Sequence, residues 1–322
     1  MVKMTVLASG SRGNSTVLSS SRTRVLVDAG LSCRELFKRM VAAGEDPRTL
    51  DAILITHEHQ DHVQGLAVTA RKLGIPVYFT EATHRAWVRW MTPQKRVTYA
   101  DWLAERRVSR LQAAQESDPS GAKAPSILEN GTGGLKPASF KDNDEPGPET
   151  ERDPCALPAV EYFLSGTGFC VGDIAVTPFT IPHDAADPVG FVFQAEGVRI
   201  GLATDLGYMP ENAKRHFRKC DVLMLESNHD LDMLRDGPYP WSVKQRVMSR
   251  VGHLSNLAAA EFLESEYDGG AAYVVLAHLS ESNNLPELAR VAAERALREK
   301  TNLLANKLLL AMQDRPMESI VL

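Results

Sequence analysis

The residues best suited to chemistry lie in one short stretch of the sequence, residues 56–62. It holds three histidines and an aspartate in the spacing H-x-H-x-D-H: His57, His59, Asp61 and His62. Neutral imidazole and carboxylate are ligands that Zn²⁺ and its first-row neighbours accept. Histidine is infrequent here, with 9 in 322 residues, so a chance occurrence of this spacing is rare. The stretch therefore predicts a metal site.

The residues just before this stretch indicate how the ligands are positioned. Residues 51–55 form an apolar run rich in β-branched side chains that ends abruptly in polar ones, which is typical of a buried strand in an α/β protein. Open α/β sheets place their sites at the carboxyl ends of strands. From an extended segment, His57 and His59 can reach one ion, while Asp61 and His62 diverge towards a second.

The spacing H-x-H-x-D-H resembles the signature of the metallo-β-lactamase fold in every position. That resemblance implies an α/β protein built as a four-layer αββα sandwich, with two mixed sheets flanked by helices. It also implies three further ligands at strand ends, and suitable residues follow predicted strands at His183, Asp205 and His278. In the family pattern one metal ion is held by His57, His59 and His183, the other by Asp61, His62 and His278, and both by a bridging Asp205.

Several other motifs make the resemblance more specific than the fold. Segments 9–14, 183–190, 226–230, 239–241, 252–256 and 278–284 together resemble the YycJ/WalJ branch. Members are regarded as metal-dependent nucleases, associated with 5′-to-3′ exonuclease action on DNA and with mismatch repair. The expected substrate, single- or double-stranded DNA, comes from this resemblance and not from composition or spacing.

The expected ligands imply hydrolysis. Two cations about 3.5–4 Å apart lower the pKa of a shared water, so that hydroxide exists at neutral pH and can attack a phosphodiester. Asp61, as a metal ligand, and His253 are the expected catalytic residues. His253 would hydrogen-bond the scissile phosphate or protonate the leaving oxygen. The expected cofactors are two divalent ions, Zn²⁺ or Mn²⁺, with iron as a further candidate.

A further set of residues is expected to hold the ligands or to contact the substrate: Asp28, Ser9, Ser11, Asn14, Glu226, His229, Asn256 and Asn283. At Asp28 the alternative is a carboxylate that only caps a turn. The glycines and hydroxyls of residues 9–14 can meet a phosphate or simply form a hairpin turn. For His229, a ligand-holding and a purely structural role stay open.

A basic amphipathic helix is predicted to begin within residues 239–250. Its cations are candidates for contacts to the DNA backbone: Lys244, Arg246 and Arg250. Phosphate contacts supply most sequence-independent affinity for DNA. Such residues are also common on any solvated helix face, so this interpretation depends on the family resemblance.

Composition bounds the class of protein. Hydrophobic residues make up 43% and charged residues 24% of the chain, which is typical of a globular protein with a substantial core. The four cysteines form no C-x-x-C pair, which argues against a disulfide framework or a thiolate zinc site. No run approaches ~18 apolar residues and no hydrophobic signal region is found, so we expect a cytoplasmic protein without a membrane partner.

One region differs in texture from the remainder. Residues 115–155 contain eleven Gly and Pro, nine acidic and four basic residues, and few large apolar ones. Such a segment buries too little apolar area to offset its ordering entropy. We therefore expect one domain over residues 1–322, with a mostly disordered insertion at about 105–158. Outside residues 115–155 the chain is neutral, so its net charge of −5 does not exclude a nucleic-acid partner.

Other functions stay open, because one fold supports several reactions. The main expectation is a metal-dependent phosphodiesterase that acts as a DNA exonuclease. The enzymatic alternatives are a small-molecule or cyclic-nucleotide phosphodiesterase and an RNase. A non-catalytic metal-binding scaffold is less favoured because no ligand is missing. The sequence does not indicate an oligomeric state.

Overall fold

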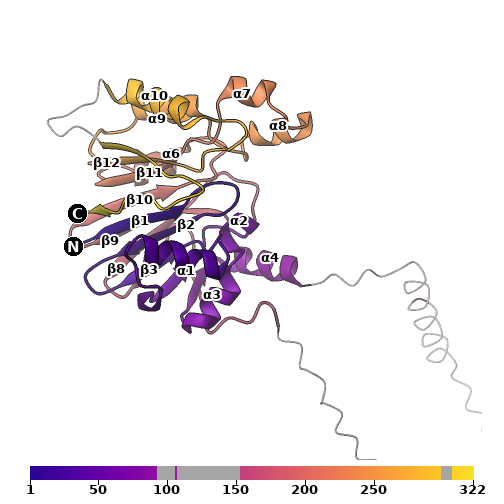
Figure 1. Ribbon diagram of the computed structural model, residues 1–322, viewed down its shortest axis with the longest axis vertical. Helices are drawn as coiled ribbons and strands as arrows, with labels where there is room; N and C mark the ends of the chain where they lie inside the picture. The colour runs from indigo at the N-terminus through magenta and orange to yellow at the C-terminus, as the bar shows by residue number, and fades with distance from the viewer. Residues whose placement is uncertain (93–105, 107–152, 299–306) are drawn as a thin grey trace, which may run out of the picture. The chain divides into compact units, whose positions relative to one another are not determined.

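Short apolar runs form strands that are covered on both faces. Every residue of β4 (Ala52–Leu54) and β11 (Val222–Glu226) is buried, as expected for central strands of an α/β protein. The structure is a computed structural model that describes residues 1–92, 106, 153–298 and 307–322. Within these residues the strands form two sheets, each of seven strands (Figure 1).

The first sheet is antiparallel at one end and parallel at the other. Its order is β14 (Ile320–Val321), β1 (Lys3–Ala8), β2 (Ser15–Ser19), β3 (Arg24–Val27), β4, β5 (Val77–Phe79) and β6 (Val160–Tyr162). Strands β14 to β3 pair antiparallel, whereas β3 to β6 pair parallel. Parallel pairing brings the carboxyl ends of β3 and β4 to the same edge of the sheet.

The second sheet is mixed in the same way. Its order is β13 (Lys307–Leu310), β12 (Tyr273–Ala277), β11, β10 (Val198–Ala203), β9 (Val189–Ala195), β8 (Ile174–Thr180) and β7 (Phe169–Val171). Strands β13 to β10 pair parallel and β10 to β7 antiparallel. The carboxyl ends of β10, β11 and β12 therefore lie together.

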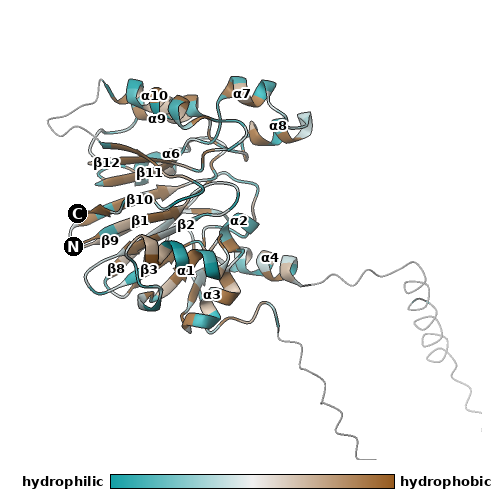
Figure 2. Ribbon diagram, viewed as in Figure 1, coloured by the Kyte–Doolittle hydropathy of each residue, from teal (hydrophilic) through white to brown (hydrophobic). Residues whose placement is uncertain are grey.

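Three apolar clusters define the layers. One lies between the sheets and includes Leu54 and Phe191. A second packs helices on the outer face of the first sheet: α1 (Cys33–Ala42), α3 (Leu66–Leu73) and α4 (Glu81–Met91). A third packs helices on the second sheet: α6 (Glu211–His216), α9 (Asn256–Ser265) and α10 (Pro286–Leu297). Figures 1 and 2 show these helices outside the two sheets, so the predicted αββα sandwich is confirmed.

Shorter elements complete the fold. They are the 3₁₀ helix η1 (Pro47–Thr49), α2 (Gln60–Val63), α7 (Leu231–Asp236) and α8 (Trp241–Val247). Gly65 separates α2 from α3, because a Cβ there would lie 2.0 Å from the carbonyl oxygen of Leu31. None of the helices in the described part of the chain is both long and apolar enough to cross a bilayer.

Most of the predicted insertion at about 105–158 lies outside the described residues. At its C-terminal end, Cys155 is buried against the helices of the first sheet. The Arg71 guanidinium donates to the carbonyl oxygens of Pro154 at 3.3 Å and Ala156 at 3.0 Å. The chain from Pro154 onwards therefore belongs to the folded unit that comprises residues 1–91 and 154–322.

Candidate metal centre

Polar side chains gather where the parallel strands of both sheets end. Asp28 follows β3, and residues 57–62 follow β4. In the second sheet Asp205 lies just beyond β10, Glu226 ends β11 and His278 follows β12. His183 comes from the loop between β8 and β9. The seven expected ligands thus meet at one place, although they are spread over more than 200 residues of sequence.

The ligand atoms fall into overlapping groups, with all atoms of a group within 4.8 Å of one another. Four groups are found among the described residues: His57, His59 and His183; Asp61, His62 and His278; His57, His62 and Asp205; and Asp205, Glu226, His253 and His278. The first two are the sets expected for two ions. Asp205 belongs to the other two and lies between the sets, as a bridging ligand must.

Individual distances suit cations. His183 Nε2 lies 3.2 Å from His59 Nδ1. Two nitrogens bound at about 2.1 Å to a tetrahedral ion lie roughly 3.4 Å apart, so one ion fits between them. On the other side, His62 Nε2 is 3.3 Å from Asp205 Oδ2, and His278 Nε2 is 3.5 Å from Asp61 Oδ2.

Two buried atoms at the centre have no hydrogen-bond partner among the described residues: His57 Nε2 and Asp205 Oδ2. The His57 side chain is fully buried, and Asp205 is 2% exposed. Burying a polar atom without a partner is costly, and for a carboxylate the cost is larger still. A divalent cation would satisfy both atoms, so the residues present fit a metal centre.

Four imidazoles are held from behind in one shared way. Each Nδ1 lies against an oxygen that can accept its proton: Thr56 Oγ1 for His57 at 3.0 Å, Asp28 Oδ2 for His62 at 2.8 Å, Gly252 O for His183 at 3.0 Å and Glu226 Oε1 for His278 at 2.9 Å. Such partners fix the ring and its tautomer, which leaves Nε2 as the free ligand atom. Asp28 therefore has the ligand-holding place expected of it.

Backbone strain is concentrated at the same centre. Three of its non-glycine residues have left-handed backbones: Asp28 with φ 59°, Asp205 with φ 62° and His278 with φ 55°. Left-handed backbone is unfavourable for these side chains and persists where surrounding contacts enforce it, often at functional sites. Each of the three lies just after a buried strand, so the strain turns the side chain into the centre.

The electrostatics of the imidazoles differ with their neighbours. Burial lowers the pKa of His57 well below its ordinary value. Burial also acts to lower the pKa of His62, but carboxylates led by Asp28 and Asp61 outweigh it and raise that pKa well above the usual range. The pKa of His278 is likewise raised well above its ordinary value, because Asp205 outweighs burial. Without a cation, His62 and His278 are thus the imidazoles that favour a proton.

His253 occupies a place of its own beside the ligands. Its Nδ1 is 2.8 Å from Glu226 Oε1 and 3.6 Å from Asp205 Oδ1, and its side chain is 23% exposed. Burial acts to lower the pKa of His253, but the negative charge of Glu226 outweighs it and raises the pKa. Burial in turn acts to raise the pKa of Glu226, yet His253 and His278 lower it to about 2. His253 is therefore a partly accessible, proton-holding group at the edge of the centre.

The loop of residues 9–14 locks two ligands in place. Asn14 donates from its backbone N to the carbonyl oxygen of Asp61 at 2.7 Å, and from Nδ2 to Asp61 Oδ2 at 3.1 Å. Ser9 Oγ accepts a hydrogen bond of 2.8 Å from the backbone N of His278. Gly10 and Gly13 have φ of 150° and 152°, which side chains rarely adopt. Ser9 and Asn14 thus hold ligands, as expected.

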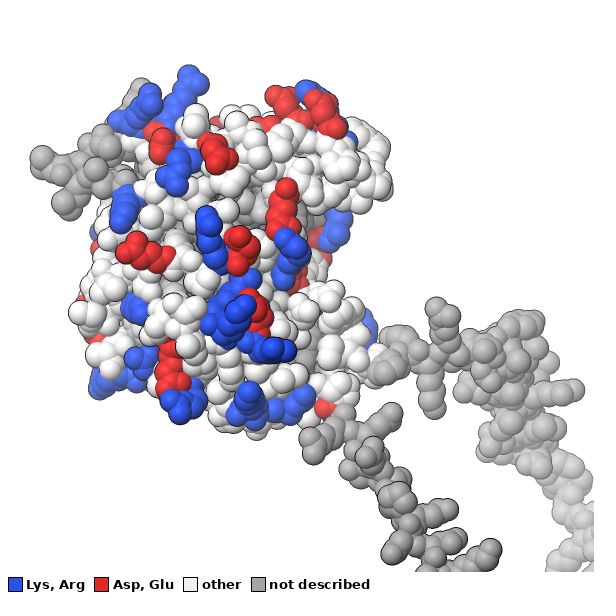
Figure 3. Space-filling model, in the orientation of Figure 1, with Lys and Arg blue, Asp and Glu red and all other residues white. Residues whose placement is uncertain are grey.

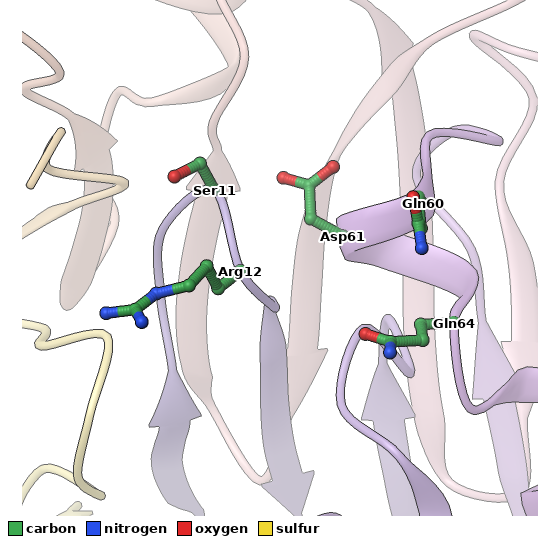
Figure 4. A pocket seen from close by; sticks show the side chains of 5 residues that line it. All are labelled: Ser11, Arg12, Gln60, Asp61 and Gln64. Atoms are coloured by element: carbon green, nitrogen blue, oxygen red, sulfur yellow. The ribbon is translucent and has the colours of Figure 1, made fainter.

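A cavity of about 530 Å³ opens beside Asp61. Its lining residues are Ser11, Arg12, Gln60, Asp61 and Gln64. Figure 4 shows Ser11 and Arg12 on one loop and, across from them, Asp61, Gln60 and Gln64 on a helical segment. A substrate that reaches the ligand set of Asp61 can therefore extend into a polar cavity.

Comparison with known proteins agrees with this geometry. The sequence profile of the metallo-β-lactamase superfamily matches residues 8–278. The chain belongs to the metallo-β-lactamase superfamily. It is 32% identical over 295 residues to the exodeoxyribonuclease YycJ of Bacillus anthracis, which covers 92% of this chain and 89% of that protein. It is 31% identical over 289 residues to the exodeoxyribonuclease WalJ of Streptococcus pneumoniae serotype 2 strain D39, with coverages of 90% and 86%.

Solved structures share the metallo-β-lactamase fold. YhfI from Bacillus subtilis matches with a TM-score of 0.59 and 14% identity, over 99% of this chain and 100% of that one. Zn²⁺-bound PqqB from Methylobacterium extorquens matches with a TM-score of 0.57 and 17% identity, over 98% and 99%. The chain is thus a hydrolase of this superfamily, whose fold implies the use of divalent metal ions.

Three residues expected near the ligands lie farther back. Asn256 is buried and bonds to Ser227 Oγ at 2.7 Å and Asn284 Oδ1 at 2.8 Å. Asn283 donates to Ser280 Oγ, with N–O distances of 3.2 Å from its backbone and 3.5 Å from its side chain. His229 is buried, and burial lowers its pKa to about 4. In this member of the superfamily these residues brace the loops behind the centre and touch no ligand side chain.

The expected backbone-contacting cations do not share one environment. Lys244 is only 9% exposed, and its ammonium donates to the carbonyl oxygen of Arg235 at 2.7 Å, so the expectation that it contacts DNA is wrong. Arg246 has a 63% exposed side chain and pairs with Asp184, next to the ligand His183. The Arg250 guanidinium lies 4.7 Å from the ring centroid of Tyr208. Arg246 and Arg250 remain candidates for substrate contacts.

Sequence reasoning missed three supporting residues. Thr56 accepts from His57 and donates to Asp28 Oδ2 at 2.9 Å, which links two ligand-bearing loops. Asn228 Nδ2 donates to the carbonyl oxygen of His278 at 2.8 Å. Arg12 lines the cavity beside Asp61. Thr56 directly precedes the H-x-H-x-D-H motif, and this adjacency is the signal that could have found it.

Proposed function

We propose that this chain is a metal-dependent DNA exonuclease that hydrolyses phosphodiesters in the 5′-to-3′ direction, with a role in DNA repair such as mismatch repair. The observation that carries the proposal is a full set of ligands for two cations with His253 held beside them by Glu226. The DNA substrate is supported by the two relatives, both named exodeoxyribonucleases, which match about nine tenths of the chain.

The metal ions would be held by the residues that meet at the strand ends. His57, His59 and His183 form one set, Asp61, His62 and His278 form the other, and Asp205 lies between them. Imidazole and carboxylate without thiolate suit Zn²⁺ or Mn²⁺, with iron as a further candidate. When bound, such ions supply Lewis acidity that activates water and offsets the negative charge of the phosphate.

Proton transfer falls to His253. Its Nδ1 faces Glu226, so Nε2 is the nitrogen left to face a substrate. The raised pKa of His253 keeps the imidazole protonated near neutral pH. A protonated imidazole can donate to the leaving oxygen of a phosphodiester, and positioned acids of this kind typically contribute about 10²–10⁴-fold to rate. Glu226 orients the ring and compensates its positive charge.

A polynucleotide would meet exposed cations on the His183 side of the centre. Arg246 approaches Asp184, and the backbone N of Asp184 donates to Val251 O at 3.1 Å, so the segment that carries Arg250 also borders this side. Figure 3 shows Lys and Arg interspersed with Asp and Glu over the face that it draws. On that face there is no broad single-sign field among the described residues, so DNA affinity would depend on a few local phosphate contacts.

The test is cleavage of end-labelled DNA by protein loaded with Mn²⁺ or Zn²⁺. Single- and double-stranded oligonucleotides, labelled at the 5′ or the 3′ end, are digested over a time course. We expect early release of the 5′ label as a short product, while the 3′ label shortens progressively. Progressive shortening from the 3′ end would overturn the proposed polarity. Turnover of bis-p-nitrophenyl phosphate without cleavage of DNA or RNA would instead identify a small-molecule phosphodiesterase.

A further inference from the structure

The cavity beside Asp61 has a lining suited to an anion. Its other lining residues offer a hydroxyl from Ser11, a guanidinium from Arg12 and two carboxamides from Gln60 and Gln64. Asp61, which would be a ligand of the second ion, is the one carboxylate among these described lining residues. The volume of about 530 Å³ is in the range of pockets that bind small molecules, so a sugar and a phosphate fit.

The position of Arg12 relative to Asp61 is fixed by backbone contacts. The backbone N of Arg12 donates to Gln313 Oε1 at 2.8 Å, and Gly13 N donates to Gly10 O at 3.0 Å. Two residues beyond Arg12, Asn14 bonds to both the backbone and the carboxylate of Asp61. The loop that presents Arg12 is thus tied directly to a residue of the metal centre, and its guanidinium moves on a fixed base.

The guanidinium itself is only weakly engaged. It forms an ion pair with Glu281, and the two side chains are 69% and 41% exposed. Solvent screens such a pair, so its contribution amounts to at most about fivefold in an equilibrium constant. A phosphate accepts two parallel, charge-assisted bonds from a guanidinium and competes well with an exposed carboxylate. Arg12 is therefore available to an anionic substrate, with Glu281 as its resting partner.

We propose that this cavity binds the phosphate that neighbours the scissile phosphodiester on the Asp61 side of the centre. Arg12 is the specificity-determining residue, and it exchanges Glu281 for that phosphate when DNA binds. The inference rests on the proposed function, since a neighbouring phosphate exists only in a polynucleotide. It identifies a contact that selects polynucleotides over small phosphodiesters, at the end of the centre opposite to Arg246.

The test removes the charge of the neighbouring phosphate chemically. Oligonucleotides carry one neutral methylphosphonate linkage, either one step 5′ or one step 3′ of the linkage to be cleaved. For the unaltered protein we expect kcat/KM to fall about 10–100-fold at one of the two positions, the size of a lost charged hydrogen bond. Arg12→Gln should lose a similar factor on ordinary DNA and no longer distinguish the two substrates.

A second variant and a matched control sharpen the result. Glu281→Gln frees Arg12, so kcat/KM on ordinary DNA should rise by up to about fivefold, with no gain on the methylphosphonate substrate. Arg48→Gln is the control, because Arg48 is an exposed arginine that pairs with Asp46 in η1, outside the cavity lining. It should discriminate as the unaltered protein does.

The outcomes separate this inference from the proposed function. Equal cleavage of ordinary and methylphosphonate DNA at both positions by the unaltered protein would overturn the inference while leaving an exonuclease. Full discrimination retained by Arg12→Gln, with its metal content intact, would overturn the role of Arg12. Failure of the unaltered, metal-loaded protein to cleave any DNA would overturn the proposed function, and the inference with it.

Discussion

His253 and Glu226 form a close pair, with Nδ1 of the imidazole 2.8 Å from Oε1 of the carboxylate. The same oxygen lies 2.9 Å from Nδ1 of His278, a residue that contributes to the Asp61 ligand set. One buried carboxylate thus orients both a ligand and the group proposed to transfer a proton. The two histidines share this partner, yet their roles differ, and the difference can be measured.

Replacement of the two histidines should separate metal binding from catalysis. His253→Ala should retain both ions and lose about 10²–10⁴-fold in turnover, because a positioned acid is removed. His278→Ala should lose metal, since a ligand is gone. Metal analysis of both variants after identical dialysis checks this prediction. If the His253 variant is the one that loses an ion, the two roles are reversed.

Replacement of Glu226 should change the pH dependence of turnover. The negative charge of Glu226 raises the pKa of His253, and a protonated His253 is the proposed donor. In Glu226→Gln the pKa of His253 should fall, so the donor loses its proton at lower pH. The alkaline limb of the pH–kcat profile should then move to lower pH, which is measured with saturating metal. An unmoved limb in a variant with full metal content would show that His253 does not supply the proton.

Metal affinity should depend on pH through two imidazoles. Carboxylates raise the pKa values of His62 and His278, so in chelated protein both hold a proton at neutral pH. A cation binds the neutral imidazole only, so binding must release these protons and weaken as pH falls. Calorimetric titrations in buffers of different protonation enthalpy should report release of about two protons per chain. Asp28→Asn removes a carboxylate that faces His62 and should reduce the number released; identical heats in all buffers would contradict the prediction.

The acidic insertion should be dispensable for the metal centre. We predict that deletion of residues 115–152, closed with a short Gly/Ser linker, preserves metal content and turnover. The deletion stops before Pro154, because Cys155 is buried and Arg71 bonds to the carbonyl oxygens on either side of it. Loop-closure entropy varies slowly with length, so the free energy of unfolding should change by roughly 1 kcal/mol. A variant that folds but loses turnover would show that the insertion contributes to catalysis.

The sequence predicted the fold and the ligands for a clear reason. Each ligand follows an apolar run that can only be a buried strand, and parallel strands bring their carboxyl ends together. Side-chain surroundings were harder to predict. Lys244 stands in a basic helical pattern, but whether its ammonium faces solvent or a carbonyl oxygen depends on how α8 packs near Arg235. Arg12 lies in a glycine-rich turn whose proximity to Asp61 follows from hydrogen bonds across 47 positions of sequence.

Asp205 is the residue on which the account of a paired metal centre depends. It lies at a strained backbone position, 3.3 Å from His62 Nε2 and 3.9 Å from His183 Nε2, and it is buried between the two ligand sets. The most direct test is the metal stoichiometry of the unaltered protein and of Asp205→Ala after loading and identical dialysis. We predict about two ions per chain in the unaltered protein and a clear loss in the variant, with the fold retained. An unchanged stoichiometry in Asp205→Ala would contradict the bridging role and with it the paired centre.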